Sequence, residues 1–166
     1  MEPFVRKKIL VVDDDPQVAT SLARRLSHAG FEVLSTRSGR GAIHCAQCQH
    51  PALMTLDVRL PDMDGLEVAM RLSHDAQTAA IPIIFITGTA DRHLKENFDS
   101  NDDHYFIRKP YDPDLLIRLI NSLLARDELG EMRRVSKAKR RQPVSAGSGQ
   151  VLSPSGSSST DSKFPS

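Results

Sequence analysis

The sequence predicts an α/β fold, a three-layer sandwich in which helices cover both faces of a five-stranded parallel sheet. Five short apolar runs are bounded by charged or turn-forming residues, and segments with helical spacing separate them. The run Ile83-Ile84-Phe85-Ile86 is apolar throughout, which indicates a strand buried on both faces. Alternating strands and helices favour parallel pairing with right-handed crossovers.

The expected strands follow the apolar runs. They are Ile9 to Val12, Phe31 to Leu34, Ala52 to Leu56, Ile83 to Thr87 and Tyr105 to Ile107. The second run partly alternates apolar and polar residues, which favours an edge position. In open parallel sheets, function collects beyond the carboxyl ends of the strands. The residues that follow each run are therefore the ones to inspect for chemistry.

The expected helices have readable ends. Asp15 and Pro16 form an N-cap and a first turn, and Gly30 should end the helix that they begin. Asp112 and Pro113 repeat this signal ahead of the clearest amphipathic stripe in the chain, which runs to Leu124. Three further helices are expected near residues 39–47, 65–73 and 91–98.

Composition indicates one folded domain with an appendage. The chain has 166 residues with 39% hydrophobic content, enough for one core. We expect the domain at residues 1–127, followed at 128–166 by a disordered tail that is basic and then rich in Ser, Gly and Pro. This tail holds seven Lys or Arg residues against three acidic ones, and it has few apolar side chains to bury. Leu129, Met132 and Val135 allow the last helix to extend by two turns.

Neither an export signal nor a membrane span is predicted. Only four apolar residues lie between Lys8 and Asp13, too few for a signal-peptide core, and no segment approaches the roughly 18 apolar residues that a membrane helix needs. We therefore expect a cytoplasmic protein without a membrane partner. Cys45 and Cys48 form a lone Cys-x-x-Cys in a predicted helix, which favours two reduced helix residues over a redox or metal site.

Polar and charged side chains gather where the expected strands end. Asp13 and Asp14 follow the first strand, Asp57 follows the third, Thr87 ends the fourth, and Lys109 lies just beyond the fifth. In a parallel sheet these residues share one cleft. Crowded carboxylates repel one another, so a hard cation is expected among them, and oxygen ligands favour Mg²⁺. A magnesium site in turn implies phosphate chemistry.

Four motifs resemble the receiver domain of response regulators in two-component signalling, over residues 6 to about 126. They are Ile9-Leu10-Val11-Val12-Asp13-Asp14-Asp15-Pro16, Asp57-Val58-Arg59-Leu60-Pro61-Asp62-Met63-Asp64-Gly65, Thr87-Gly88-Thr89-Ala90 and Lys109-Pro110. Each motif alone is moderately specific, but all four occur in the expected order and spacing. The resemblance implies a flavodoxin-like sheet with strand order 2-1-3-4-5.

The resemblance also implies a phosphoacceptor and a metal site. Asp57 would attack the phosphoryl group of a phosphohistidine and form an acyl phosphate. Mg²⁺ would be held by Asp13, Asp14, Asp57 and the main-chain carbonyl of Arg59. Such a chain is a switch and not an enzyme, apart from slow self-dephosphorylation.

Signal transmission is implied by three further residues. Lys109 would pair with the phosphoryl oxygens, and the Thr87 hydroxyl would hydrogen-bond one of them. Movement of Thr87 would leave space for Phe106, which lacks a hydroxyl and can act by packing alone. Strand alternation places Tyr105 at the surface, although a register shift would exchange the two aromatic residues.

Three functions compete. The first is a receiver that accepts phosphate from a sensor histidine kinase or phosphotransfer protein and signals by contact with a protein target, with dimerisation on phosphorylation left open. The second is the receiver portion of a DNA-binding transcription regulator, but the tail has no second apolar helix to build a helix-turn-helix core. The third, a phosphoryl-transfer enzyme, lacks a Gly-rich phosphate loop and a second base.

A basic cluster near the end of the predicted helical extension raises the question of nucleic acid. No aromatic residues interleave with its charges, which favours a solvated segment over a nucleic-acid site. Its members are Arg133, Arg134, Lys137, Lys139, Arg140 and Arg141. Nucleic acid is therefore not an expected partner.

Overall fold

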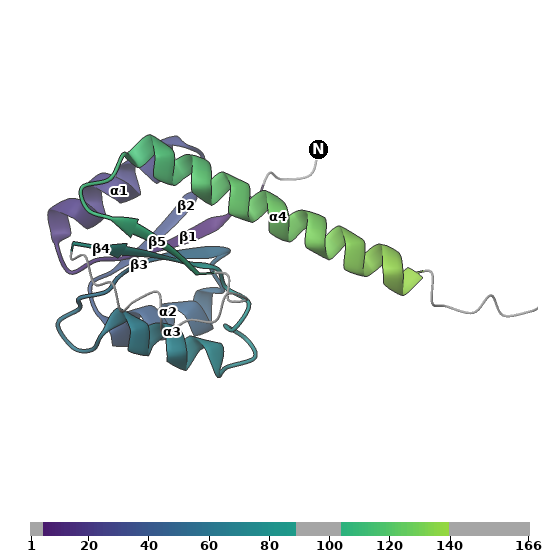
Figure 1. Cartoon of the computed structure of the whole chain (residues 1–166), viewed down its shortest axis with the longest axis horizontal. Coiled ribbons are helices and arrows are strands. Elements are labelled where there is room, and N and C mark those ends of the chain that lie inside the picture. Colours follow the sequence, from purple (N-terminus) through teal and green to yellow (C-terminus); the bar gives the residue numbers. More distant parts are fainter. Residues whose placement is uncertain (1–4, 89–103, 140–166) are drawn as a thin grey trace, which may run out of the picture.

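The predicted fold class and strand order are confirmed in the computed structural model of the chain, which describes residues 5–88 and 104–139. All strand pairs are parallel, and the sheet order is β2-β1-β3-β4-β5 (Figure 1). The strands are β1 (Lys8–Val12), β2 (Glu32–Thr36), β3 (Leu53–Asp57), β4 (Ile83–Thr87) and β5 (His104–Arg108). The helices are α1 (Pro16–His28), α2 (Gly39–Gln49), α3 (Gly65–Ser73) and α4 (Pro113–Lys139).

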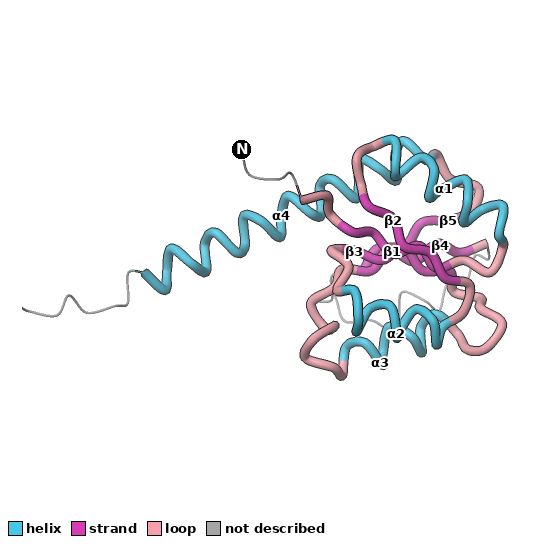
Figure 2. Tube along the Cα trace, turned by 180° about the vertical axis from the view of Figure 1, so that it is seen from behind, coloured by secondary structure: helices cyan, strands magenta, loops and turns pink. Residues whose placement is uncertain are grey.

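Helices cover both faces of the sheet. Figures 1 and 2 show α1 and the first part of α4 on one face, and α2 and α3 together on the other. Strand alternation lets one strand serve both layers, because successive side chains point to opposite faces. In β1, Ile9 and Val11 pack in the core beneath α1 and α4, whereas Leu10 and Val12 pack in the core beneath α2 and α3. The sandwich therefore has two cores.

The helix ends follow the sequence signals. The Asp15 carboxylate accepts hydrogen bonds from the backbone N–H groups of Gln17 (2.8 Å) and Val18 (3.3 Å), so it caps α1. Gly30 has φ of +97°, a conformation that favours glycine, just beyond the end of α1. The helix expected at 65–73 is present with these bounds, and the one expected at 39–47 extends to Gln49. The helix expected at 91–98 lies outside the described residues.

Helix α4 continues well beyond its buried stripe. It passes the expected domain boundary at Asp127 without a break and runs to Lys139, so the two-turn extension is present (Figure 1). A Lys7–Glu128 ion pair of 2.7 Å holds it to the start of β1. Residues 140–166 lie outside the described part, and the division into domain and tail stays a prediction. Within the described ranges, no helix is long and apolar enough to cross a membrane.

One buried hydroxyl lies in the centre of the sheet. Thr55 is 1% exposed, and its Oγ1 has no hydrogen-bond partner among the described residues. Since an unpaired buried hydroxyl is unfavourable, we expect Thr55→Val to raise the free energy of unfolding by about 1 kcal/mol, measured by urea unfolding. Thr55→Ser keeps the hydroxyl but loses a methyl group, so it should lower the free energy of unfolding. A lower midpoint for the valine variant would show that the hydroxyl has a partner.

Candidate functional site

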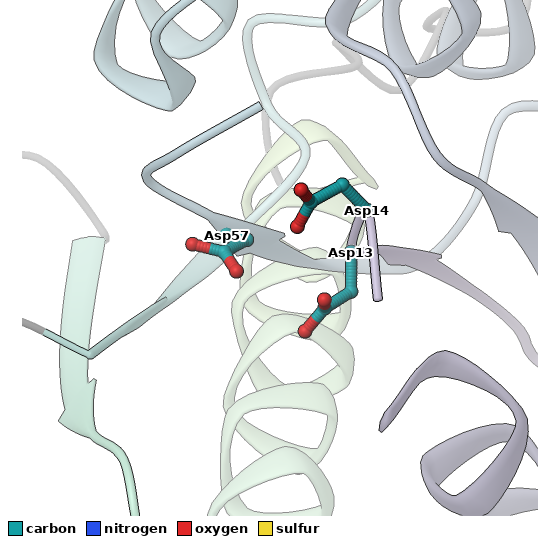
Figure 3. A group of neighbouring side chains, drawn as sticks. All are labelled: Asp13, Asp14 and Asp57. Atoms are coloured by element: carbon teal, nitrogen blue, oxygen red, sulfur yellow. The ribbon is translucent and has the colours of Figure 1, made fainter. Parts of the chain in front are cut away.

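The strand ends bring three carboxylates together at one edge of the sheet. Asp13 and Asp14 follow β1, and Asp57 ends β3; one oxygen from each lies within 4.8 Å of the other two (Figure 3). Asp13 is 4% exposed and Asp57 is 7% exposed, while Asp14 is open to solvent. The juxtaposition expected from parallel pairing is present, with two of the carboxylates buried.

Lys109 lies between the two buried carboxylates. Its Nζ is 2.8 Å from Oδ2 of Asp13 and 2.8 Å from Oδ2 of Asp57. Burial alone favours the neutral amine, but the hydrogen bonds and charges of these carboxylates outweigh it and raise the pKa of Lys109 above its usual value. The Lys109 backbone N–H donates to the Thr87 carbonyl at 2.7 Å, which keeps the lysine beside the end of β4.

The other oxygen of each buried carboxylate is held by the backbone. Oδ1 of Asp13 accepts from the Asp15 N–H, and Oδ1 of Asp57 accepts from the Arg59 N–H, both at 3.0 Å. Each carboxylate is therefore fixed by its own loop on one side and by Lys109 on the other. Fixed carboxylates keep their oxygens aimed at the centre of the cluster.

The loop after Asp57 folds back tightly onto the end of β3. Arg59 pairs with Asp64 in an isolated antiparallel bridge, and the Gly65 N–H donates to the Val58 carbonyl at 2.7 Å. A Cβ at Gly65 would collide with the Asp57 carbonyl oxygen, so only glycine lets α3 begin this close to the strand end. This close approach was not predicted, although an Asp-Gly pair ahead of a helical pattern was the available signal.

The residues assigned to the switch lie on the last two strands. Thr87 is 6% exposed, and it shares a face of β4 with Phe85, two residues earlier. Phe106 on β5 is half-buried and stacks on Phe85, with ring centroids 4.9 Å apart and planes 11° from parallel. Tyr105 packs on the opposite face as a half-buried residue, and its hydroxyl accepts from Arg126 at 3.0 Å. Alternation therefore places Phe106 on the α2 and α3 side.

Comparison with known proteins decides the family. The family model for the response regulator receiver domain matches residues 9–121. The chain belongs to this family. A receiver domain is a phosphoacceptor signalling switch rather than an enzyme in its own right, and its family implies a histidine kinase as partner.

Two curated relatives differ in how much of their length this receiver covers. It is 38% identical to a probable transcriptional regulator, ycf27, of Cyanophora paradoxa over 74% of this chain and 50% of that protein. It is 30% identical to Protein PilH of Pseudomonas aeruginosa over 71% of this chain and 98% of that protein. The chain thus spans about half the length of the transcription regulators that it resembles, and nearly all of PilH.

Solved structures agree with the fold. A CheY-like response regulator receiver domain protein from Methanospirillum hungatei is 26% identical, with a TM-score of 0.69 over 76% of this chain and 99% of that one. A putative response regulator from Chloroflexus aurantiacus is 30% identical, with a TM-score of 0.66 over 73% of this chain and 99% of that one. The receiver's sheet and helices therefore follow the architecture of its relatives.

The acidic cluster is typical of the magnesium site of receivers. Its donors are all carboxylate oxygens, which suit a hard cation. Asp14 is exposed, so the cluster is open to water on that side, and Mg²⁺ usually keeps several water ligands. The residues present therefore fit the ion that the family implies.

Proposed function

We propose that the chain takes a phosphoryl group onto Asp57 from a histidine kinase or phosphotransfer protein in the cytoplasm, and then signals through contact with a protein target. One observation carries this proposal: the buried Asp57 carboxylate ends a central strand and faces both the acidic pair and the ammonium of Lys109. Asp13 and Asp14 follow an earlier strand and suit the role of metal ligands. Family membership supports the partner class.

In the proposed reaction, an Asp57 carboxylate oxygen attacks phosphorus, and the new P–O bond forms as the N–P bond of the phosphohistidine breaks. The imidazole leaves with the electron pair of that bond and takes up a proton from solvent. Lys109 moves from the Asp57 carboxylate to the phosphoryl oxygens. The lysine can make this move because its ammonium is a point charge on a flexible side chain. Bound Mg²⁺, held by Asp13, Asp14, Asp57 and the Arg59 carbonyl, would supply further positive charge at those oxygens. The product is an acyl phosphate.

Transmission would start at Thr87. Its hydroxyl would hydrogen-bond a phosphoryl oxygen, and this movement would change the packing around Phe85 and Phe106 on the same side of the sheet. Phe106 would act by packing alone. The altered surface around β5 would then be read by the protein target.

A groove beside Lys109 supports docking of the phosphate donor. It has a volume of about 420 Å³ and lies between α1 and the segment that leads from β5 into α4. Val18 and Leu22 line it on the α1 side, and Tyr111 and Pro113 line it on the other. Because Lys109 itself lines the groove, a partner surface seated there would place a phosphohistidine near Asp57.

The second hypothesis, the receiver portion of a DNA-binding transcription regulator, draws support from the relatives. Several proteins of about twice the matched length are named as transcriptional regulators, and RpaA of Synechocystis is named as a DNA-binding dual master transcriptional regulator. A mobility shift assay with the present chain tests direct DNA binding. Binding by this chain in physiological salt would favour the second hypothesis.

Acetyl phosphate with Mg²⁺ tests the proposed chemistry. We expect the chain to gain one phosphoryl group by intact mass, stable in acid and labile in base, as an acyl phosphate should be. Chelation of Mg²⁺ with EDTA should remove most of the labelling, because the carboxylate cluster would then repel the incoming phosphate. Equal labelling in EDTA, or no labelling in Mg²⁺, would contradict the proposal.

A further inference from the structure

The tip of the loop that follows Asp57 is fastened to the amino end of α2. Oδ1 of Asp62 accepts from the Gly39 N–H at 2.7 Å, and Oδ2 accepts from the Arg40 N–H at 2.9 Å. The Ser38 hydroxyl accepts the next free donor, the Gly41 N–H, at 3.1 Å. The first N–H groups of a helix have no partner within the helix, so Asp62 satisfies two of them from a different part of the chain.

Packing adds to this contact. A Cβ at Gly39 would collide with the side chain of Met63, which neighbours Asp62 in the loop. It would also lie 2.8 Å from Cγ2 of Val68 on α3. The glycine therefore allows the loop tip and α3 to sit against the start of α2, on the face of the sheet where both helices lie (Figure 2).

The carboxylate of Asp62 is charged in this contact. The N–H donors of Arg40 and Gly39 lower the pKa of Asp62, and the amino end of a helix favours negative charge. Asp62 is exposed, so its effect depends on two directed hydrogen bonds rather than on burial. An aspartate in a turn commonly bonds its own backbone two residues on, whereas Asp62 reaches another helix.

The loop is short between this contact and the site. Only Leu60 and Pro61 separate Asp62 from Arg59, and proline fixes its own φ. The Arg59 N–H holds Oδ1 of Asp57 at 3.0 Å, and Arg59 also pairs with Asp64. Movement of Asp62 would therefore displace the Arg59 main chain.

We propose that Asp62 is a positioning residue that ties the Asp57–Gly65 loop to α2 and so holds the Arg59 main chain in place for Asp57 and Mg²⁺. The inference rests on the proposed function, because it assigns Arg59 to that metal site. Coupling between sites is reciprocal. Mg²⁺ binding should then stabilise the first turn of α2, although that helix carries none of the proposed metal ligands.

The test compares the full chain with Asp62→Ala and Asp62→Asn by NMR. We expect Asp62→Ala to weaken Mg²⁺ binding about fivefold or more, since coupling energies of this kind are typically that large. Asparagine keeps one acceptor oxygen and should fall between alanine and the parent chain. Without Mg²⁺, the Arg59 amide should exchange faster in Asp62→Ala. In the parent chain, Mg²⁺ should slow exchange of the Gly39 and Arg40 amides.

Asp75→Ala is the matched control. Asp75 is half-buried, its pKa is also lowered by hydrogen bonds, and it accepts from Gln77 N–H (2.9 Å) and from Gln47 Nε2 near the other end of α2 (3.0 Å). Its replacement removes the same charge and another α2 contact, so a general electrostatic or structural effect would appear in both variants. We expect Asp75→Ala to leave the Mg²⁺ dissociation constant within about twofold of the parent value.

The outcomes separate the two proposals. Equal Mg²⁺ affinity and equal Arg59 exchange in Asp62→Ala and Asp75→Ala would overturn the positioning role, provided that the parent chain binds Mg²⁺ and accepts phosphate. A parent chain that does neither would overturn the proposed function instead. Should Asp62→Ala unfold, Asp62→Asn decides: parent-like affinity and exchange in a folded Asp62→Asn would reject the proposal, and an intermediate loss would support it.

Discussion

Asp57→Asn is expected to abolish phosphorylation by acetyl phosphate in the presence of Mg²⁺. A neutral amide is not a nucleophile for phosphorus, whereas the carboxylate is. Asparagine can still accept the Arg59 N–H through its side-chain oxygen, so the loop geometry is kept. Intact mass after incubation measures the labelling, and the change should be from one phosphoryl group to none.

Asp112→Asn is the control for this experiment. Asp112 is exposed, and its carboxylate accepts the Asp114 N–H at 2.9 Å at the start of α4. Asparagine serves equally well at such a position, so the variant should be labelled like the parent chain. Labelling of Asp57→Asn at the parent level would place the acceptor elsewhere, and peptide mapping would then distinguish Asp13 from Asp14.

The juxtaposition in the site followed from the sequence because a parallel sheet brings the carboxyl ends of its strands to one edge. Once apolar runs identified β1, β3 and β5, the residues after them had to converge, and Asp13, Asp57 and Lys109 do so. The sequence predicted less sharply which face of the sheet each of Tyr105 and Phe106 occupies. The strand β5 begins at His104, one residue earlier than predicted, and a shift of register by one residue would exchange the two faces. Strand alternation separates the two rings, but Tyr105, which was expected at the surface, is half-buried against the core beneath α1 and α4.

Contacts between elements that are distant in the chain were beyond sequence reasoning. Asp62 reaches the first turn of α2, 22 to 23 residues earlier, and nothing in the local pattern distinguishes it from an ordinary turn aspartate. The close approach of Gly65 to Asp57 is different, because both residues flank one loop and the Asp64-Gly65 pair signals a turn there. Contacts such as that of Asp62 with α2 are set by the relative placement of the elements, which periodicity does not specify.

The end of the last helix shows a different limit. The predicted boundary at Asp127 marks where buried apolar residues stop, but α4 runs on to Lys139. Residues 125–139 contain no proline and many good helix formers, and Gly130 is the main exception. The buried apolar stripe and the helix therefore end at different residues. The sequence pattern predicted the end of the buried stripe more sharply than the end of the helix.

Lys109→Met is expected to lower the free energy of unfolding by about 2–3 kcal/mol in Mg²⁺-free buffer. The change leaves the buried carboxylates of Asp13 and Asp57 close together without the ammonium that now lies 2.8 Å from each. Removing one partner of a buried ion pair typically costs 3–5 kcal/mol, and the partial exposure of Lys109 reduces this value. Urea unfolding measures this loss of stability. Added Mg²⁺ should reduce the difference in the free energy of unfolding between Lys109→Met and the parent chain, because the ion supplies positive charge to the carboxylates.

Lys7→Met provides the comparison, because Lys7 forms an ion pair of 2.7 Å with Glu128 at the surface. That exposed pair should contribute less than about 1 kcal/mol. The raised pKa of Lys109 sets the pH window: its stabilisation is fully present below the ordinary value of 10.5 and is lost as the pH rises through the raised pKa. The difference in the free energy of unfolding between the parent chain and Lys109→Met should thus stay constant between about pH 7 and 9. If Lys109→Met were no less stable than Lys7→Met, the buried carboxylates would not depend on this ammonium.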